Sequence, residues 1–257
     1  MPQYVITTAA GTGSPGSGGD GGAATSAAFK YLSGLAMDAF DNLYVADSND
    51  CKIRVVNSTT GIIKTYAGTG MQGSSGDGGQ AISALLNQPQ AVAVDISRGS
   101  VFIADTGNGK IRIVTSDGTI TTFAGSGYAS SNTYDCAATS AQLVNPASLA
   151  VDSVGNVYIG TGNPYGSNNF QVLVVAHGTG FITLFAGTGG SNSYMSPPSY
   201  GDPATSTLLY LPTGIAVDSS FNLYIATASL YILQLSYRAT DLETLDPNEP
   251  ADRTTDG

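Results

Sequence analysis

Two acid–base pairs with the same spacing are the first residues in this sequence that could do chemistry. Asp47 is followed by Arg54, and Asp105 by Arg112, in the parallel phrases ADSNDCKIR and ADTGNGKIR. Opposite charges on the two strands of a hairpin can face each other and support the sheet. We interpret both as exposed structural ion pairs, so replacing either arginine by alanine should remove only about 0–1 kcal/mol of stability.

Four aspartates recur at one position of a repeated phrase and could together hold a cation on a central axis. They are Asp38, Asp95, Asp152 and Asp218. Calcium takes six to eight oxygen ligands, which single turn carboxylates rarely supply. We therefore expect each aspartate to close a turn by accepting hydrogen bonds from its own backbone. Asp20 and Asp77, in two GDGG sequences, are interpreted as loop caps. We expect no cofactor, and calcium at either set of aspartates is the alternative.

The inventory of catalytic residue types is sparse. The one histidine, His177, cannot build a multi-histidine zinc site, and we expect it in a solvated turn. The two glutamates, Glu243 and Glu249, both lie near the C-terminal end. We therefore predict no catalytic residue and no metal site. The two cysteines, Cys51 and Cys136, are expected to be separate thiols.

Composition limits the classes of protein that this chain can be. Only 11% of the 257 residues are charged, 42% are apolar, and 33 are glycine, a mixture that favours strands joined by glycine turns. The net charge is −10, and no basic cluster is present, which argues against a nucleic-acid partner. The longest apolar runs are too short for a membrane-spanning helix.

A long internal repeat positions these residues. The string AGTG or AGSG begins at residues 10, 67, 124 and 186, and the phrase AMD or AVD begins at residues 36, 93, 150 and 216. Each unit predicts four short strands separated by turn residues. In the first unit we expect them at Leu35–Asp38, Asn42–Asp47, Lys52–Val56 and Ile62–Ala67. A four-stranded antiparallel sheet repeated around an axis is a β-propeller, so the predicted fold class is all-β.

With AGTG…GDGG…ATSA, QPQAVAVD and VFIADTGNGKIRIV in the same order, residues 4–238 resemble the NHL-repeat β-propeller family. The resemblance implies a propeller that is usually six-bladed, whereas this chain has four units. Lactonase-type and amidating-lyase propellers have a similar architecture, but they depend on glutamate-containing calcium sites or multi-histidine metal sites that have no counterpart here.

The two ends of the chain bear on how the propeller closes. Residues 4–9 match the fourth strand of a unit, and the last unit has no recognisable fourth strand after Ser236. We therefore favour a closed four-bladed ring in which residues 4–9 complete the last blade, with an arc of a six-bladed propeller as the alternative. Residues 1–238 would form the propeller, and residues 239–257 an acidic, disordered tail.

The units differ most in their loops. The second hairpin of unit three contains GTGNPYGSNNF (160–170), and the loop that follows this unit is expanded over residues 187–212. Both connections emerge on the same face of a propeller, and their Tyr, Asn, Ser and Gly content suits recognition. The candidate binding residues are Asn163, Tyr165, Asn168, Asn169, Tyr194 and Tyr200. Drift of loop sequences in a decaying repeat would explain the same pattern.

These features favour a non-enzymatic scaffold that presents this loop face to a protein or a glycan. The alternative is a degenerate lactonase- or lyase-type hydrolase with a cation on the axis. The start of the chain shows no signal peptide, so the compartment stays open: an extracellular or cell-surface module if the chain is part of a longer protein, otherwise a cytoplasmic one.

Overall fold

The computed structural model describes residues 5–163, 168–190, 202–228 and 231–236. Within them the chain consists of short strands, loops and single turns of 3-10 helix. The proposed tail at residues 239–257 lies outside the described residues.

The strands form four antiparallel sheets, one for each sequence unit, which we number blades 1 to 4. Blade 1 contains β1 (Leu32–Met37), β2 (Leu43–Asp47), β3 (Lys52–Val56) and β4 (Ile63–Ala67). Blade 2 contains β6 (Ala91–Asp95), β7 (Ser100–Asp105), β8 (Lys110–Val114) and β9 (Thr119–Ala124). Blade 3 contains β11 (Ser148–Val151), β12 (Val157–Asn163), β13 (Asn168–Val175) and β14 (Phe181–Ala186). Blade 4 contains β15 (Pro212–Val217), β16 (Leu223–Thr227) and β17 (Ile232–Leu235). The predicted all-β propeller fold is confirmed.

The segment that precedes each blade also contributes to it. The two-residue strands β5 (Gly79–Gln80) and β10 (Cys136–Ala137) pair with β9 and β14, the outer strands of blades 2 and 3. The repeated ATS and AIS sequences form 3-10 turns at η1 (Ala24–Ser26), η3 (Ala81–Ser83), η5 (Ala138–Ser140) and η6 (Ala204–Ser206). Two further 3-10 turns, η2 (Ser48–Asp50) and η4 (Thr106–Asn108), join the second and third strands of blades 1 and 2.

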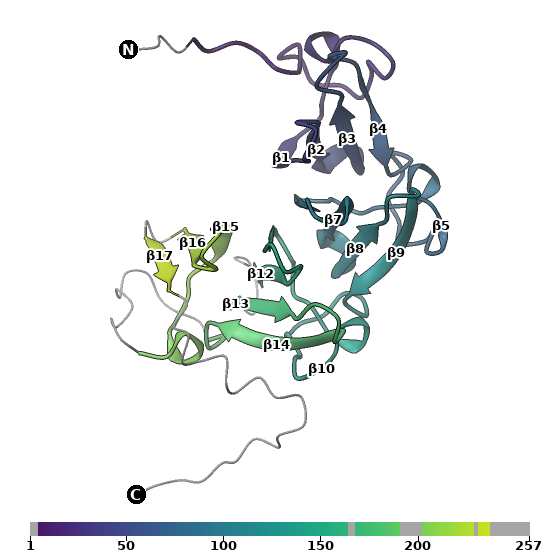
Figure 1. Ribbon diagram of the computed structural model, residues 1–257. Helices are drawn as coiled ribbons and strands as arrows, with labels where there is room; N and C mark the ends of the chain where they lie inside the picture. Colours follow the sequence, from purple (N-terminus) through teal and green to yellow (C-terminus); the bar gives the residue numbers. More distant parts are fainter. Residues whose placement is uncertain (1–4, 164–167, 191–201, 229–230, 237–257) are drawn as a thin grey trace, which may run out of the picture.

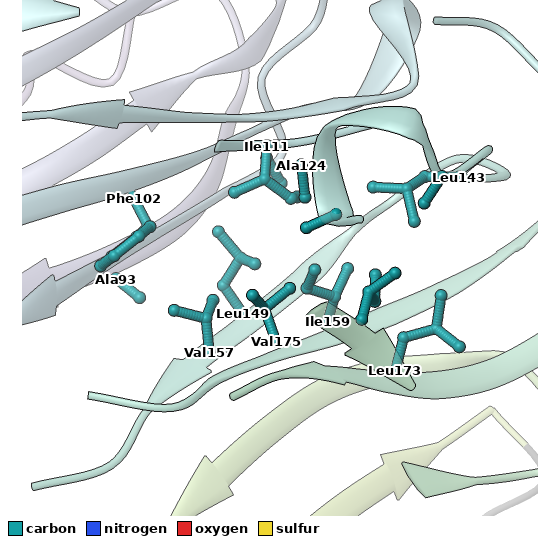
Figure 2. Packing of buried hydrophobic residues seen from close by; sticks show 14 of the residues in the cluster. Ala93, Phe102, Ile111, Ala124, Leu143, Leu149, Val157, Ile159, Leu173 and Val175 are labelled. Carbon is teal, nitrogen blue, oxygen red and sulfur yellow. The ribbon is translucent and has the colours of Figure 1, made fainter. Parts of the chain in front are cut away.

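Side chains packed between neighbouring blades form the core. Figure 2 shows the cluster between blades 2 and 3, where Phe102 and Ile111 lie opposite Leu149 and Ile159. The innermost strands β1, β6, β11 and β15 are neighbours in that order around the axis. The alanine that recurs on each innermost strand is a small residue that suits this crowded position.

The four blades form an open arc rather than a closed ring (Figure 1). Residues 5–9 form no strand of blade 4, whose described sheet has the three strands β15-β16-β17. The closed ring that we favoured is therefore not the arrangement seen, because blade 4 does not reach the N-terminal segment, which extends away from blade 1. No helix in the described parts of the chain is long and apolar enough to cross a bilayer.

Candidate functional site

The arginines of the two predicted ion pairs are buried. Arg54 on β3 and Arg112 on β8 have no exposed surface, and neither have Asp47 and Asp105 at the ends of β2 and β7. The prediction of exposed pairs was therefore wrong about exposure. The physical reason is the GDGG segment, which runs along the outer strand of blade 1 and of blade 2 and brings a carboxylate to the arginine.

The nearest partner of each arginine is a GDGG aspartate. Arg112 Nη2 donates to Oδ1 of Asp77 at 2.5 Å, and the Thr122 hydroxyl donates to Oδ2 at 2.7 Å. Burial alone would raise the pKa of Asp77, but these hydrogen bonds and the guanidinium charge hold it below its ordinary value. Arg54 and Asp20 repeat the arrangement at 2.5 Å. The two aspartates are therefore engaged by arginine and threonine.

The carboxylate of Asp105, at the end of β7 in blade 2, has three partners. Asp105 accepts hydrogen bonds from the Asn87 backbone N–H at 2.7 Å and from the Asn108 side-chain amide at 2.8 Å. Arg112 Nη1 lies 3.5 Å from Oδ2 of Asp105, so this predicted pair is present as a longer contact. Burial raises the pKa of Asp105 above its ordinary value, although the hydrogen bonds and Arg112 act in the opposite direction.

In blade 1 the corresponding aspartate, Asp47 at the end of β2, has different partners. The register of β2 and β3 places Lys52 opposite Asp47, and Arg54 opposite Val45, so the spacing of seven gives diagonal neighbours. Asp47 Oδ1 accepts the backbone N–H groups of Lys30 and Tyr31, both at 3.0 Å. The predicted Asp47–Arg54 ion pair was therefore wrong. Asp47 binds the backbone of the two residues that precede β1, and Arg54 forms its ion pair with Asp20.

Blade 3 has neutral residues at the three positions of Asp77, Asp105 and Arg112, which we call the ionic set of blade 2. The register of β12 with β13 places Leu173 where blade 2 has Arg112, and the end of β12 has Thr161 where β7 has Asp105. The 57-residue repeat places Tyr134 at the position of Asp77. Leu173 is fully buried, and Tyr134 packs against the same cluster.

The recurring aspartates close turns, as predicted. Asp152 Oδ1 accepts the backbone N–H groups of Val154, Gly155 and Asn156 at 2.8–3.0 Å, and the Tyr158 hydroxyl donates to Oδ2 at 3.2 Å. The corresponding turns at Asp38 and Asp218 use the same pattern of donors. The hydrogen bonds from this turn lower the pKa of Asp38, although burial alone would raise it.

A hollow of about 350 Å³ lies beside these turns, at the ends of the innermost strands of blades 2 to 4. Its lining combines three valines, Ile96, three serines and the turn aspartates Asp95, Asp152 and Asp218. Among the described residues, no three His, Cys, Asp or Glu side chains come together closely enough to hold a metal ion. The aspartates of the hollow accept hydrogen bonds within their own turns.

The hairpin between β12 and β13 is longer than its counterparts. These strands have seven and eight residues, whereas β2 and β3 have five each. Asn132, in the loop before blade 3, supports its base by donating to Thr161 Oγ1 at 2.7 Å and to Gln171 Oε1 at 2.8 Å. The sequence analysis missed Asn132. The signal in the sequence was the absence from unit three of the Asp–Arg pair, because another polar residue then has to bind the base of this hairpin.

Three of the predicted binding residues, all asparagines, lie on this hairpin. Asn163 and Asn168 pair across its tip, and the Asn169 side chain donates to the backbone carbonyl of Ser130 at 2.9 Å. Tyr165, Tyr194 and Tyr200 lie outside the described residues. The structure therefore brings three of the six predicted residues to one hairpin and describes no position for the tyrosines.

Comparison with protein families and curated proteins agrees with the repeat. The family model described as the Teneurin NHL domain matches residues 69–138. NHL repeat-containing protein 2 from Bos taurus is 29% identical over 190 residues, which are 70% of this chain and 25% of that protein. Teneurin-1 from Mus musculus is 35% identical over 150 residues, which are 51% of this chain and 5% of that protein.

These matches support the resemblance of this chain to the NHL-repeat β-propeller family. The chain spans a quarter or less of the length of these curated relatives, so the matched region is one part of each of them.

Solved structures share the propeller fold of this chain. A protein of unknown function from Bacteroides thetaiotaomicron has a TM-score of 0.61 at 18% identity, covering 79% of this chain and 46% of its own. The structure titled Nidogen/Laminin Complex has a TM-score of 0.55 at 20% identity, covering 80% of this chain and 60% of the other. At these identities the likeness concerns the fold alone.

His177 and the two cysteines are the remaining reactive side chains of the propeller. His177 lies on the turn before β14, where its Nε2 is 3.0 Å from Nη2 of Arg98 on blade 2. Cys51 is buried and Cys136 is partly buried, and both are free thiols, as predicted. Cys51 adopts a left-handed conformation with φ of 49° at the end of η2.

Proposed function

We propose that this propeller is a non-enzymatic module that binds a protein partner through the face from which the β12–β13 hairpin projects. The observation that carries the proposal is the length of this hairpin and the support of its base by Asn132. A hairpin fixed by hydrogen bonds at its base loses less conformational freedom on binding than a free loop would lose.

The sequence places tyrosines where such a hairpin and the following loop would meet a partner. Tyr165 lies between the two strands, and Tyr194 and Tyr200 lie in the segment between β14 and η6. A tyrosine can bury a large ring while its hydroxyl keeps a hydrogen bond to water or to the partner. Anchors of this kind typically lose 2 kcal/mol or more of binding free energy on truncation to alanine, about thirtyfold in affinity.

Two further observations support a protein partner rather than a reaction. The structure titled Nidogen/Laminin Complex places a propeller of this fold in a protein complex. The body of this chain has one histidine and no glutamate, which leaves few groups for acid–base or metal chemistry. A glycan ligand and the lactonase-type alternative become outcomes of the experiment.

The experiment is affinity purification with the tagged chain as bait, followed by binding measurements on the protein recovered. The test variant carries Tyr165→Ala, Tyr194→Ala and Tyr200→Ala together. The control is Tyr31→Ala, because Tyr31 is 60% exposed and directly precedes β1 of blade 1. We expect the control to bind like the wild type and the triple variant to lose at least thirtyfold in affinity.

Three results would overturn the proposal. Equal binding by the triple variant would place the site elsewhere on the propeller. Binding on a glycan array, with no protein retained, would change the class of ligand. Hydrolysis of a lactone panel that depends on a bound metal, measured with elemental analysis of the purified protein, would favour the enzymatic alternative.

A further inference from the structure

The N-terminal segment, residues 5–9, has the sequence of an outer strand, but its side chains are exposed where those of the outer strands are buried. The AGTG motif that follows β4 also follows residues 5–9, and this repeat places Ile6 at the position of Ile63. In blades 1 to 3 this position is always isoleucine, and all three side chains are completely buried: Ile63, Ile120 and Ile182. Ile6, in contrast, is 103% exposed.

Blade 4 has the complementary feature, a third strand with no described fourth strand beside it. In blades 1 to 3 the third strand pairs with an outer strand: β3 with β4, β8 with β9, and β13 with β14. The described sheet of blade 4 ends at β17. Ile232 on β17 is 77% exposed, whereas the corresponding Ile53 and Ile111 are fully buried.

The inner strand at the open end of blade 1 is also missing a neighbour. Leu35 on β1 is 63% exposed, while Val92 and Leu149, at the same position of blades 2 and 3, are 4% and 8% exposed because each packs against the preceding blade. Among the described residues, the arc therefore has an exposed apolar face at each of its two ends. The face of blade 1 has the residues that normally meet a preceding blade, and the face of blade 4 has the residues that normally meet a following one.

Within one chain these two ends do not meet. The backbone N–H groups of Gly11 and Thr12 donate to the carbonyls of Ala24 and Ala27 at 2.9 Å, which fixes the start of the N-terminal segment on blade 1. From there the segment extends away from the arc, and blade 4 lies at the other end (Figure 1). A donor from another molecule has no such restriction.

We propose that residues 5–9 of one copy add as the fourth strand of blade 4 in a second copy of this chain. Strand addition would cover an exposed sheet edge, which otherwise invites uncontrolled pairing. It would also bring blade 1 of the donor against blade 4 of the acceptor, so that Leu35 and Ile232 enter an interface of the kind that already joins blades 1 to 3.

The internal blades define the register of this contact. β3 pairs Val56 with Ile63 and Val55 with Lys64. Transferred by the repeat, this register places Ile6 opposite Leu235, and Thr7 opposite Gln234. Each copy has one donor end and one acceptor end, so the assembly is head-to-tail and forms either a ring or an open chain. The net charge of −10 opposes association, so added salt should strengthen it.

The first test is the mass of the full chain as a function of protein and salt concentration, by analytical ultracentrifugation. We expect dimers or larger species that increase in 0.5 M salt. Ile6→Lys should remain a monomer, because a charge cannot replace a buried isoleucine, whereas Ile82→Lys should behave like the wild type, because Ile82 is 56% exposed on η3. A wild type that stays monomeric at every concentration, or an Ile6→Lys variant that assembles normally, would overturn the proposal.

The second test fixes the register and separates exchange between copies from closure within one copy. In a Cys136→Ser background, a Thr7→Cys copy is mixed with an isotopically heavy Gln234→Cys copy and oxidised. We expect a disulfide between the light and heavy copies, with much less when Ile82→Cys replaces Thr7→Cys. A Thr7→Cys, Gln234→Cys chain that closes its own disulfide at high dilution, with no linked copies, would overturn exchange between copies in favour of a closed ring.

Discussion

Replacing Arg112 by alanine should lower the free energy of unfolding by about 3 kcal/mol, the magnitude typical of removing one partner from a buried ion pair. The variant leaves Asp105 completely buried with two neutral hydrogen-bond donors and no cation. Asp77 keeps the hydroxyl of Thr122 and is 46% exposed, so its loss is smaller. Most of the destabilisation should therefore come from the carboxylate of Asp105.

Urea denaturation at pH 7, followed by circular dichroism, measures this difference. Arg98→Ala is the matched control: Arg98 also forms an ion pair, with Asp95 at 2.9 Å, but its side chain is 42% exposed. The control should lose only about 0–1 kcal/mol. A loss below 1 kcal/mol for Arg112→Ala would refute the argument from burial and restore the interpretation of a dispensable pair.

Blade 3 supplies a compensated variant for the same experiment. Arg112→Leu, Asp77→Tyr and Asp105→Thr together convert the ionic set of blade 2 into the residues that blade 3 has at these positions. Removing all charged partners at once leaves no isolated buried charge, so the triple variant should recover most of the stability lost by Arg112→Ala. If it is less stable than Arg112→Ala, the two blades do not differ by simple exchange of this set.

Four other substitutions test the turns and loops by urea denaturation. Gly125→Ala should lower the free energy of unfolding by about 3 kcal/mol, because φ is +92° and the new Cβ would lie 2.3 Å from the carbonyl oxygen of Gly109. Gly11→Ala is the control and should lower it by about 1 kcal/mol, because φ is +100° but only a phenylalanine ring lies near, at 3.4 Å. Equal losses would contradict this reasoning. Asp152→Ala should cost about 2 kcal/mol by leaving backbone donors of its turn unpaired, and an unchanged midpoint would contradict this. The pKa of Asp77 is lowered on folding, so its contribution is present above its ordinary value and is lost as pH falls through the lowered pKa. Asp77→Asn should therefore differ most from the wild type near pH 7 and converge with it toward pH 2, and a constant difference would contradict the assignment.

The sequence predicted the blades well because their signals are local. Apolar alternation, turn residues and the recurring alanine all act within a few residues, and the observed strands of blade 1 lie close to the predicted ranges. The turn role of Asp152 was predictable for the same reason, since its backbone partners lie two to four residues away.

The partner of each arginine was not predictable in the same way. Asp20 and Asp77 lie 34 and 35 residues before the arginines that they bind, in a loop whose path depends on the preceding blade. A spacing of seven across a hairpin correctly placed Asp105 near Arg112, but it could not show that a third group would bury both. The prediction of a closed ring was wrong for a related reason. The angle between neighbouring blades depends on packing along their whole interface, and no single motif specifies that angle.

The neutral residues of blade 3 occur together with its longer hairpin between β12 and β13. In blade 2 the β7–β8 hairpin is held to the preceding loop, because Asn108 of η4 donates both to Asp105 and to the carbonyl of Gly73. A longer hairpin there would break these contacts and expose a buried carboxylate. Once Thr161 and Leu173 replace the charged residues, the hairpin base needs only the neutral donors of Asn132. We therefore expect the longer hairpin to require the loss of these charged residues. Grafting it onto blade 2 should be tolerated only together with the three substitutions at Asp77, Asp105 and Arg112. Urea denaturation of the graft with and without them checks this, and a graft that is equally stable in both backgrounds would contradict it.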